Sequence, residues 1–159
     1  MRTITVALGE KTYNIEIAAG LLDQIGAKAR VLSQAVKAAI ISDSNVDPLY
    51  GERLERSLAA SGFEVTRIVF AAGEQSKNLT VLGQVYDELA RAGLTRSDLI
   101  LTLGGGVPGD LGGFAAATFL RGIDFIQVPT SLLAQIDSSV GGKVAIDLPS
   151  GKNLAGSFY

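Results

Sequence analysis

The sequence predicts an α/β fold: a Rossmann-like, doubly wound, mostly parallel sheet with an N-terminal β-hairpin. The first reason is that short apolar runs alternate with stretches that carry apolar residues at helical spacing, as in chains built from βαβ units. The second is that glycine is frequent, with 19 in 159 residues, which predicts tight turns and close approach of the backbone to a ligand. The apolar fraction of 47% and the length suit one folded domain over residues 1–159.

The first half of the chain contains the hairpin and the first crossover of the predicted sheet. Gly9 and Glu10 are expected to form a type II′ turn within the hairpin. Asp47 and Pro48 are expected to start a helix as its N-cap and first-turn proline, and Gly62 to follow its end. The predicted elements are, in order, strands over 4–8 and 13–17, a helix over 20–30, a strand over 36–42, a helix from Asp47, and a strand over 63–70.

The second half continues the alternation of strands and helices. Asn78 is expected to cap a helix that Gly93 ends. A later helix, rich in glycine and alanine, suits close packing under a sheet. The predicted elements are a helix between Asn78 and Gly93, a strand over 99–103, the glycine-rich helix over 111–119, a strand over 124–128, and a short helix followed by loops or hairpins over 132–159.

Charge and hydropathy exclude two classes of partner. The net charge is −2, from 14 basic and 16 acidic residues without a basic block, which argues against a nucleic-acid surface. No apolar run is long enough to span a membrane, and the N-terminus alternates like a strand and lacks the features of a signal peptide. A cytoplasmic location is therefore expected.

The chain contains neither histidine nor cysteine. The usual zinc ligands are thus missing, and only carboxylates and carbonyls remain as metal ligands. Histidine is also the commonest general base near neutral pH. An enzyme made of this chain alone would have to use Asp, Glu, Lys and Tyr.

Polar residues and glycines follow four of the predicted strands. Parallel α/β sheets bind ligands outside the carboxyl ends of their strands, so these residues are expected to share one edge. The strand–glycine–helix segment from Leu99 to Asp110 is the form of an anion-binding corner, in which free N–H groups face a phosphate. The groups at this edge are Asp43 with Asn45, residues 73–77, residues 104–110, and Thr130 with Ser131.

Several of these residues allow two interpretations each. Asp43 can hold a ribose hydroxyl or an adenine edge, or it can simply cap its own turn. Glu74 and Lys77 can bind a phosphate or ribose, or they can be a capping pair with a solvated lysine. Asp110 suits the first turn of a helix by its charge alone, and Arg121 is either an anion ligand or a cation at a helix C-terminus.

The densest polar cluster lies between residues 137 and 153. Asp137, Lys143, Lys152 and Asn153 stand there among glycines and small apolar residues. Turns explain the glycines, but lysines on glycine loops normally bind anions. The pattern therefore favours a functional site.

The run from Gly104 to Tyr159 closely resembles the 3-dehydroquinate synthase family: GGGVPGDLGGFAAATFLRGIDFIQVPTSLLAQIDSSVGGKVAIDLPSGKNLAGSFY. The segments SDSNV and GEQSK also resemble NAD-binding elements of that family. The resemblance covers the N-terminal, Rossmann-like domain and implies a helical domain beyond Tyr159. It implies an enzyme that uses NAD and a divalent metal, zinc or cobalt, to convert 3-deoxy-D-arabino-heptulosonate 7-phosphate into 3-dehydroquinate and phosphate.

The resemblance also implies roles for individual residues. Substrate contacts fall to Asp137, Lys143 and Asn153, and Arg121 reaches the substrate phosphate across a homodimer. The metal ligands lie in the helical domain. The implied NAD ligands are Asp43, Asn45, Glu74, Lys77, Gly105, Gly106, Val107, Asp110, Thr130, Ser131, Lys143 and Lys152.

Four positions, Pro108, Ser131, Val144 and Asp147, differ from the residues usual in the family. Two other hypotheses remain open: a related sugar-phosphate cyclase that makes a carbasugar or aminocyclitol precursor, and a non-catalytic nucleotide-binding module. The expectation is a domain fragment of the shikimate-pathway enzyme that binds NAD weakly and is inactive alone.

Overall fold

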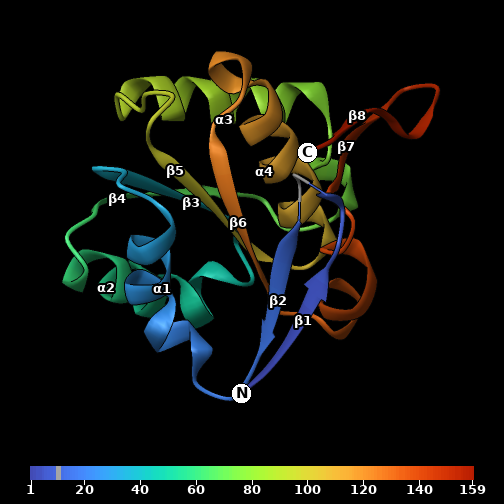
Figure 1. Ribbon diagram of the computed structural model, residues 1–159. Coiled ribbons are helices and arrows are strands. Elements are labelled where there is room, and N and C mark those ends of the chain that lie inside the picture. The colour runs from blue at the N-terminus through green and yellow to red at the C-terminus, as the bar shows by residue number, and fades with distance from the viewer. Residues whose placement is uncertain (10–11) are drawn as a thin grey trace.

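The computed structural model describes residues 1–9 and 12–159 and is organised around a four-stranded sheet (Figure 1). All four strands are parallel, in the order β4-β3-β5-β6. The chain moves outward from β3 to β4 and returns to the other side of β3 with β5, which confirms the doubly wound sheet. The strands are β3 Lys37–Asp43, β4 Glu64–Phe70, β5 Leu99–Gly104 and β6 Asp124–Pro129.

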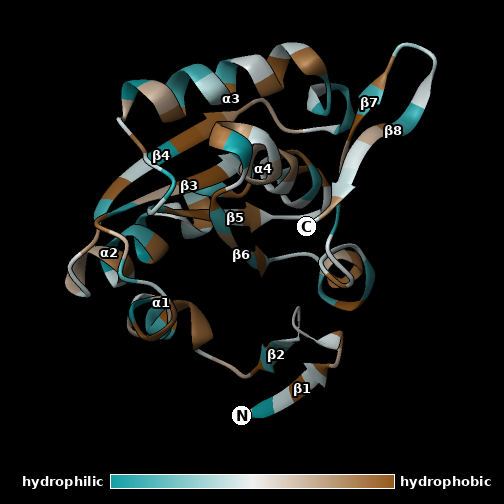
Figure 2. Ribbon diagram, turned by 45° about the horizontal axis from the view of Figure 1, so that its top comes forward, coloured by the Kyte–Doolittle hydropathy of each residue, from teal (hydrophilic) through white to brown (hydrophobic). Residues whose placement is uncertain are grey.

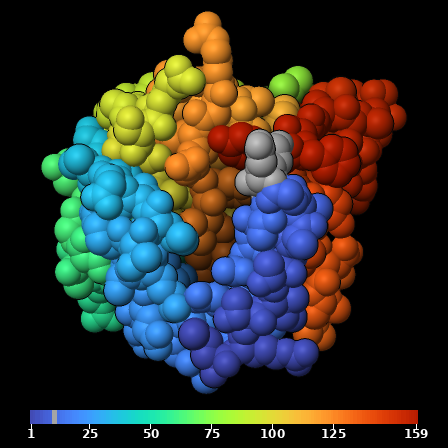
Figure 3. All heavy atoms as spheres, viewed as in Figure 1, coloured from blue at the N-terminus to red at the C-terminus, as the bar shows by residue number. Residues whose placement is uncertain are grey.

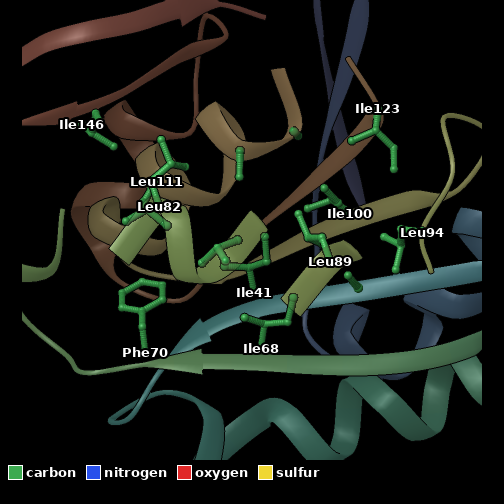
Figure 4. Packing of buried hydrophobic residues seen from close by; sticks show 14 residues of the cluster. Ile41, Ile68, Phe70, Leu82, Leu89, Leu94, Ile100, Leu111, Ile123 and Ile146 are labelled. Atoms are coloured by element: carbon green, nitrogen blue, oxygen red, sulfur yellow. The ribbon is translucent and has the colours of Figure 1, made fainter. Parts of the chain in front are cut away.

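Helices cover both faces of this sheet because successive strand residues point to opposite sides. On one side, Ile41 packs with Leu89 of α3 and Leu111 of α4 (Figure 4). On the other side, the adjacent Ile40 packs in a second cluster with Leu58 of α2. Figure 2 shows apolar residues along the central strands and alternating apolar and polar bands along α3. The helices are α1 Ile25–Leu32, α2 Glu52–Ala60, α3 Leu79–Arg91 and α4 Gly106–Thr118.

Two antiparallel hairpins complete the fold: β1 Arg2–Val6 with β2 Tyr13–Ile17, and β7 Lys143–Leu148 with β8 Gly151–Phe158. The N-terminal hairpin is a separate sheet, and Figure 3 shows a hollow between it and the α1 region. The backbone N–H of Gly141 donates to the Tyr13 hydroxyl, at 2.7 Å, and ties this hairpin to the second half of the chain. The strand predicted over 4–8 ends at Val6, and Glu10 of the predicted turn lies outside the described residues.

Most residues that the sequence predicts to begin or end a helix do so in the structure. The Asn78 side chain accepts the N–H of Val81 and caps α3. Gly62 and Gly93 follow α2 and α3 with φ of 85° and 67°, the left-handed conformation that favours glycine. Asp47 is not the predicted N-cap, because it lies inside a single helical turn, Asp47–Gly51, and its carboxylate faces the Arg67 guanidinium at 3.6 Å.

Helix α4 begins at Gly106, five residues before its predicted start. Glycine and proline disfavour helix interiors, but the first four N–H groups of a helix have no intrahelical partner, so Pro108 is tolerated at its third position. Asp110 therefore lies in the second turn and not in the first, where it was expected. The predicted close packing is confirmed, because a Cβ at Gly112 would lie 2.6 Å from the Thr102 side chain and one at Gly113 2.4 Å from that of Val144.

Asp98, just before β5, joins the starts of two strands. Its carboxylate accepts the backbone N–H of Lys37 at 2.8 Å, and the N–H and hydroxyl of Thr95 at 2.7 and 2.8 Å. Burial opposes the ionisation of this group, but the hydrogen bonds outweigh it and hold the pKa of Asp98 below its ordinary value.

We expect Asp98→Asn to lower the free energy of unfolding by about 1–3 kcal/mol at pH 7, since a buried N–H loses its charged acceptor. A folded-state pKa below the unfolded value, about 3.9, stabilises the protein above that pH, and this stability is lost as the pH falls through the folded-state pKa. The variant should therefore lose less stability on acidification than the unsubstituted protein. Urea denaturation at pH 7 and at about pH 3 measures both effects. Asp87→Asn, at an exposed position of α3, serves as control, and equal acid sensitivity of all three proteins would contradict the assignment.

Candidate functional site

The polar residues predicted to share an edge do so, because four parallel strands end there. Asp43 ends β3, Gly104 ends β5, and the loop after β4 contains a short helical turn, Glu74–Ser76. The backbone N–H of Thr130, after β6, donates to the Gly104 carbonyl at 2.9 Å. The point where the sheet order reverses lies between β3 and β5, the usual place for a ligand in an open α/β sheet.

The glycine corner between β5 and α4 leaves room for a ligand. Gly104 has to be glycine, because a Cβ there would lie 2.5 Å from the Pro108 ring. Gly105 and Gly106 are not required by the backbone. Gly105 has a φ of −79°, and the nearest atom to a Cβ would be the Ser131 hydroxyl at Gly105 and the Ser138 hydroxyl at Gly106, each at 3.4 Å. Their missing side chains leave the N–H groups at the start of α4 approachable, which fits a phosphate group.

Asp43 lies beside this corner, at the end of the adjacent strand. One carboxylate oxygen accepts the backbone N–H groups of Asn45 and Val46 at 2.9 and 3.0 Å, so the residue does cap its own turn. Within residues 1–9 and 12–159 no group donates to the second oxygen, and the side chain is buried. The two interpretations of Asp43 are therefore compatible.

The centre of the site is Lys77, whose side chain is almost completely buried, with 4% of the residue exposed. Its ammonium group donates to the Asp110 carboxylate at 3.0 Å and to the Asn153 side-chain oxygen at 2.6 Å. The carboxylates of Glu74 and Asp147 lie 3.7 and 3.8 Å away. The interpretation of Lys77 as a solvated lysine is wrong, since residues from three segments enclose it.

The charges in this cluster depend on one another. Burial acts to lower the pKa of Lys77, but the hydrogen bond and charge of Asp110, with the charges of Glu74 and Asp147, outweigh it and raise that pKa. Burial raises the pKa of Asp110, and Lys77 only partly offsets it. The lysine is therefore a fixed cation with three carboxylates around it.

Two further ion pairs lie at the rim of the cluster. The Lys152 ammonium contacts the Glu74 carboxylate at 3.1 Å, and that of Lys143 contacts the Asp137 carboxylate at 3.0 Å. Both pairs are largely exposed, so they contribute little to stability and can exchange partners for a ligand. A groove of about 550 Å³ borders the cluster between Glu74 and Asp147.

The remaining predicted residues fall in two places. Ser131 lies at the edge described above, where its hydroxyl accepts the N–H of Ala134 at 3.3 Å, and Val107 lies in the first turn of α4. Arg121 lies beyond the opposite end of α4, a helix of 13 residues and about 20 Å, and does not join the cluster. Leu120 and Arg121 have positive φ values of 52° and 70°, an uncommon strained conformation outside glycine.

The site contains one residue that sequence reasoning did not place there, Asp147. It had been noted only as a departure from the family pattern. Asp147 reaches the site because β7 packs on α4 through Val144 and Gly113. These two residues are 31 positions apart, so no local pattern reveals the contact. The signal that was available is the spacing of Asp147 and Asn153 around Pro149 and Gly151, which is typical of a hairpin with polar residues near its turn.

Residues 1–9 and 12–159 offer neither a metal site made of several side chains nor a membrane-spanning helix. No group of three or more His, Cys, Asp or Glu side chains there is arranged to hold a metal ion. No helix in the same part of the chain is long and apolar enough to cross a membrane.

Residues 67–159 match the family model described as 3-dehydroquinate synthase N-terminal. The chain belongs to this family. The match covers the GEQSK loop, the glycine corner and the hairpin that carries Asp147 and Asn153, so it contains the Lys77 cluster, whereas Asp43 and Asn45 lie before its first residue.

Individual proteins that are similar to this chain support the family assignment. The 3-dehydroquinate synthase of Clostridium acetobutylicum is 55% identical over the whole chain, which covers 45% of that protein. A solved 2-deoxy-scyllo-inosose synthase, complexed with carbaglucose-6-phosphate, NAD⁺ and Co²⁺, is 29% identical, with a TM-score of 0.91 over 99% of this chain and 43% of its own. ValA, a 2-epi-5-epi-valiolone synthase from Streptomyces hygroscopicus with NAD⁺ and Zn²⁺ bound, is 30% identical, with a TM-score of 0.79 over 97% of this chain and 42% of its own. The chain thus spans less than half the length of these relatives.

Proposed function

We propose that this chain is the NAD-binding part of a 3-dehydroquinate synthase, an enzyme that converts 3-deoxy-D-arabino-heptulosonate 7-phosphate into 3-dehydroquinate and phosphate. The observation that carries the proposal is the buried Lys77 cluster beside a glycine corner at the reversal point of the sheet. The cluster offers acceptor oxygens for hydroxyl groups, and the corner offers N–H donors for a pyrophosphate. A dinucleotide has both kinds of group.

NAD, when bound, would accept a hydride from the substrate and later return it. The protein's part is to bind and orient the cofactor. The Gly105–Val107 backbone would face the pyrophosphate, and Asp43 would take a hydroxyl or adenine edge with its free oxygen. The residues proposed to bind NAD are Asp43, Asn45, Glu74, Lys77, Gly105, Gly106, Val107, Asp110, Thr130, Ser131, Lys143 and Lys152.

The substrate would lie on the side of Asp137, Lys143 and Asn153. Lys143 would attract the substrate's negative groups, because its exposed pair with Asp137 can open at little cost. Arg121, too far from this cluster to join it within one chain, is proposed to act across a homodimer. A zinc or cobalt ion, a helical domain beyond Tyr159 and a cytoplasmic location belong to the same proposal for the whole enzyme.

The identity to curated synthases, 55%, favours this function over that of the sibling cyclases, at 29–30%. A sibling substrate remains the second candidate, because the fold agreement with 2-deoxy-scyllo-inosose synthase is close. A purely binding module would not need Asp137, Lys143 and Asn153 beside the cofactor.

Titration of the 159-residue chain with NAD⁺ tests the proposal. We expect weak, saturable binding, and we expect Lys152→Ala to weaken it about fivefold, since an exposed charge contact contributes up to about 1 kcal/mol. Lys28→Ala, which removes an ion pair on α1 with Glu16, should leave the affinity unchanged. Assayed with the sugar phosphate, NAD⁺ and zinc, the chain should form no dehydroquinate. Turnover by the pure chain, or no saturable binding of NAD⁺, would overturn the proposal.

A further inference from the structure

Asp147 lies at an irregularity of the second hairpin. In the pairing of β7 with β8, Ile146 is opposite Ala155 and Leu148 is opposite Gly151, with a register shift between them. Bulges of this kind free a backbone N–H and redirect a side chain. The freed N–H of Asp147 donates to the backbone carbonyl of Lys77 at 2.8 Å, in a different part of the chain.

Three hydrogen bonds form a closed ring through Asp147, Lys77 and Asn153. The Asp147 N–H donates to the Lys77 carbonyl, and the Lys77 ammonium donates to the Asn153 side-chain oxygen at 2.6 Å. The Asn153 N–H then donates to the Asp147 carboxylate at 2.8 Å. Each residue is both donor and acceptor, so displacing one of them breaks two of the three hydrogen bonds.

The ring also accounts for the backbone of Asn153. Its φ of 55° is left-handed, which is uncommon for residues other than glycine, although asparagine tolerates it best. The carboxylate of Asp147 holds the N–H of this residue, so that the side-chain oxygen turns toward Lys77. Asp147 is itself well covered, with 19% of its side chain exposed, which limits competition from water.

We propose that Asp147 is a positioning residue that sets the placement of Lys77 and Asn153 for the bound cofactor and substrate. This inference rests on the proposed function, because Lys77 is assigned there to NAD and Asn153 to substrate. Asp147 acts through its acceptor oxygen, which holds Asn153, and through its charge, 3.8 Å from the Lys77 ammonium.

Two substitutions separate these two parts. Asp147→Asn keeps an acceptor oxygen and removes the charge, whereas Asp147→Ala removes both. We expect Asp147→Ala to weaken NAD⁺ binding about tenfold and Asp147→Asn less than about threefold, since only the alanine variant loses the acceptor for the Asn153 N–H. Asp87→Ala, at an exposed position of α3, is the matched control and should bind NAD⁺ as the unsubstituted chain does.

A second readout is the titration of the Lys77 ammonium, followed by NMR. Both Asp147 variants should lower the pKa of Lys77, because each removes a neighbouring negative charge, and Asp87→Ala should not. A residue that merely braced the hairpin would change the thermal stability of Asp147→Ala and leave the Lys77 titration of Asp147→Asn unmoved.

The NAD⁺ affinity and the Lys77 titration each test the role of Asp147. Unchanged NAD⁺ affinity in a folded Asp147→Ala chain overturns the inference, and so does an unchanged Lys77 titration in Asp147→Asn. If Asp147→Ala does not fold, the Lys77 titration of Asp147→Asn decides alone. If the unsubstituted chain does not bind NAD⁺, the proposed function fails, and the Lys77 titration, which needs no cofactor, still tests the ring.

Discussion

Lys77→Ala is expected to lower the free energy of unfolding by about 3–5 kcal/mol at pH 7, because removing one partner of a buried ion pair leaves uncompensated charge. Three carboxylates surround this ammonium, and Asp110, only partly exposed, depends on it most directly at 3.0 Å. Burial already raises the pKa of Asp110, and without Lys77 only the smaller effect of the Lys143 charge opposes it. The loss should therefore be smaller near pH 4, where protonation relieves the repulsion among the three carboxylates.

Urea denaturation at the two pH values measures this difference. Lys152→Ala is the matched control, since it removes an ammonium from the same Glu74 at a position that is 72% exposed. Its effect on stability should stay within about 0.5 kcal/mol at either pH. If Lys77→Ala lowered the free energy of unfolding as little as the control does, the Lys77 ammonium would not be what stabilises the cluster.

Gly26→Ala is expected to cost about 2–3 kcal/mol, because overpacking of a close contact forces backbone shifts. A Cβ at Gly26 would lie 1.8 Å from the carbonyl oxygen of Ser57, so α1 and α2 would have to separate. The separation would also break the hydrogen bond from the Gly26 N–H to the Ser57 hydroxyl, at 3.0 Å.

The control for this change is Gly83→Ala, in the interior of α3. Beyond the backbone of α3 itself, no atom of the described residues lies within 4 Å of a Cβ at that position, so alanine should stabilise the protein by about 0.5–1 kcal/mol through helix propensity. Thermal denaturation of both variants should thus give shifts of opposite sign. A melting temperature of Gly26→Ala at or above that of the unsubstituted protein would show that the α1–α2 contact is looser than described.

Features that depend on neighbouring residues were the ones that the sequence predicted well. Asn78 caps α3, and Gly62 and Gly93 follow helices, because caps and left-handed turns are determined within a few positions. The alternation of apolar runs likewise predicted the parallel sheet. The start of α4 was misplaced because packing on β5 and β7 overrides the low helix propensity of Gly106 and Gly109.

The candidate site was predicted less completely. The strand ends that form its edge follow from topology, so Asp43, Glu74 and Asp110 were expected near one another. The burial of Lys77 and the presence of Asp147 in the site could not be predicted, because both depend on how the β7–β8 hairpin packs on α4. No local pattern distinguishes a buried lysine from an exposed one when its partners lie far along the chain.

The ring through Asp147, Lys77 and Asn153 has a consequence for folding. Its hydrogen bond from Lys77 to Asn153 joins residues 76 positions apart, so the entropy of closing that loop must be offset before the contact forms. Strands β3, β4 and β5 pair across shorter separations along the chain than the one between Lys77 and Asn153. The cluster that would receive a cofactor is therefore expected to form after β3 has paired with β4 and β5, so a chain that has only assembled its sheet would not yet be able to bind.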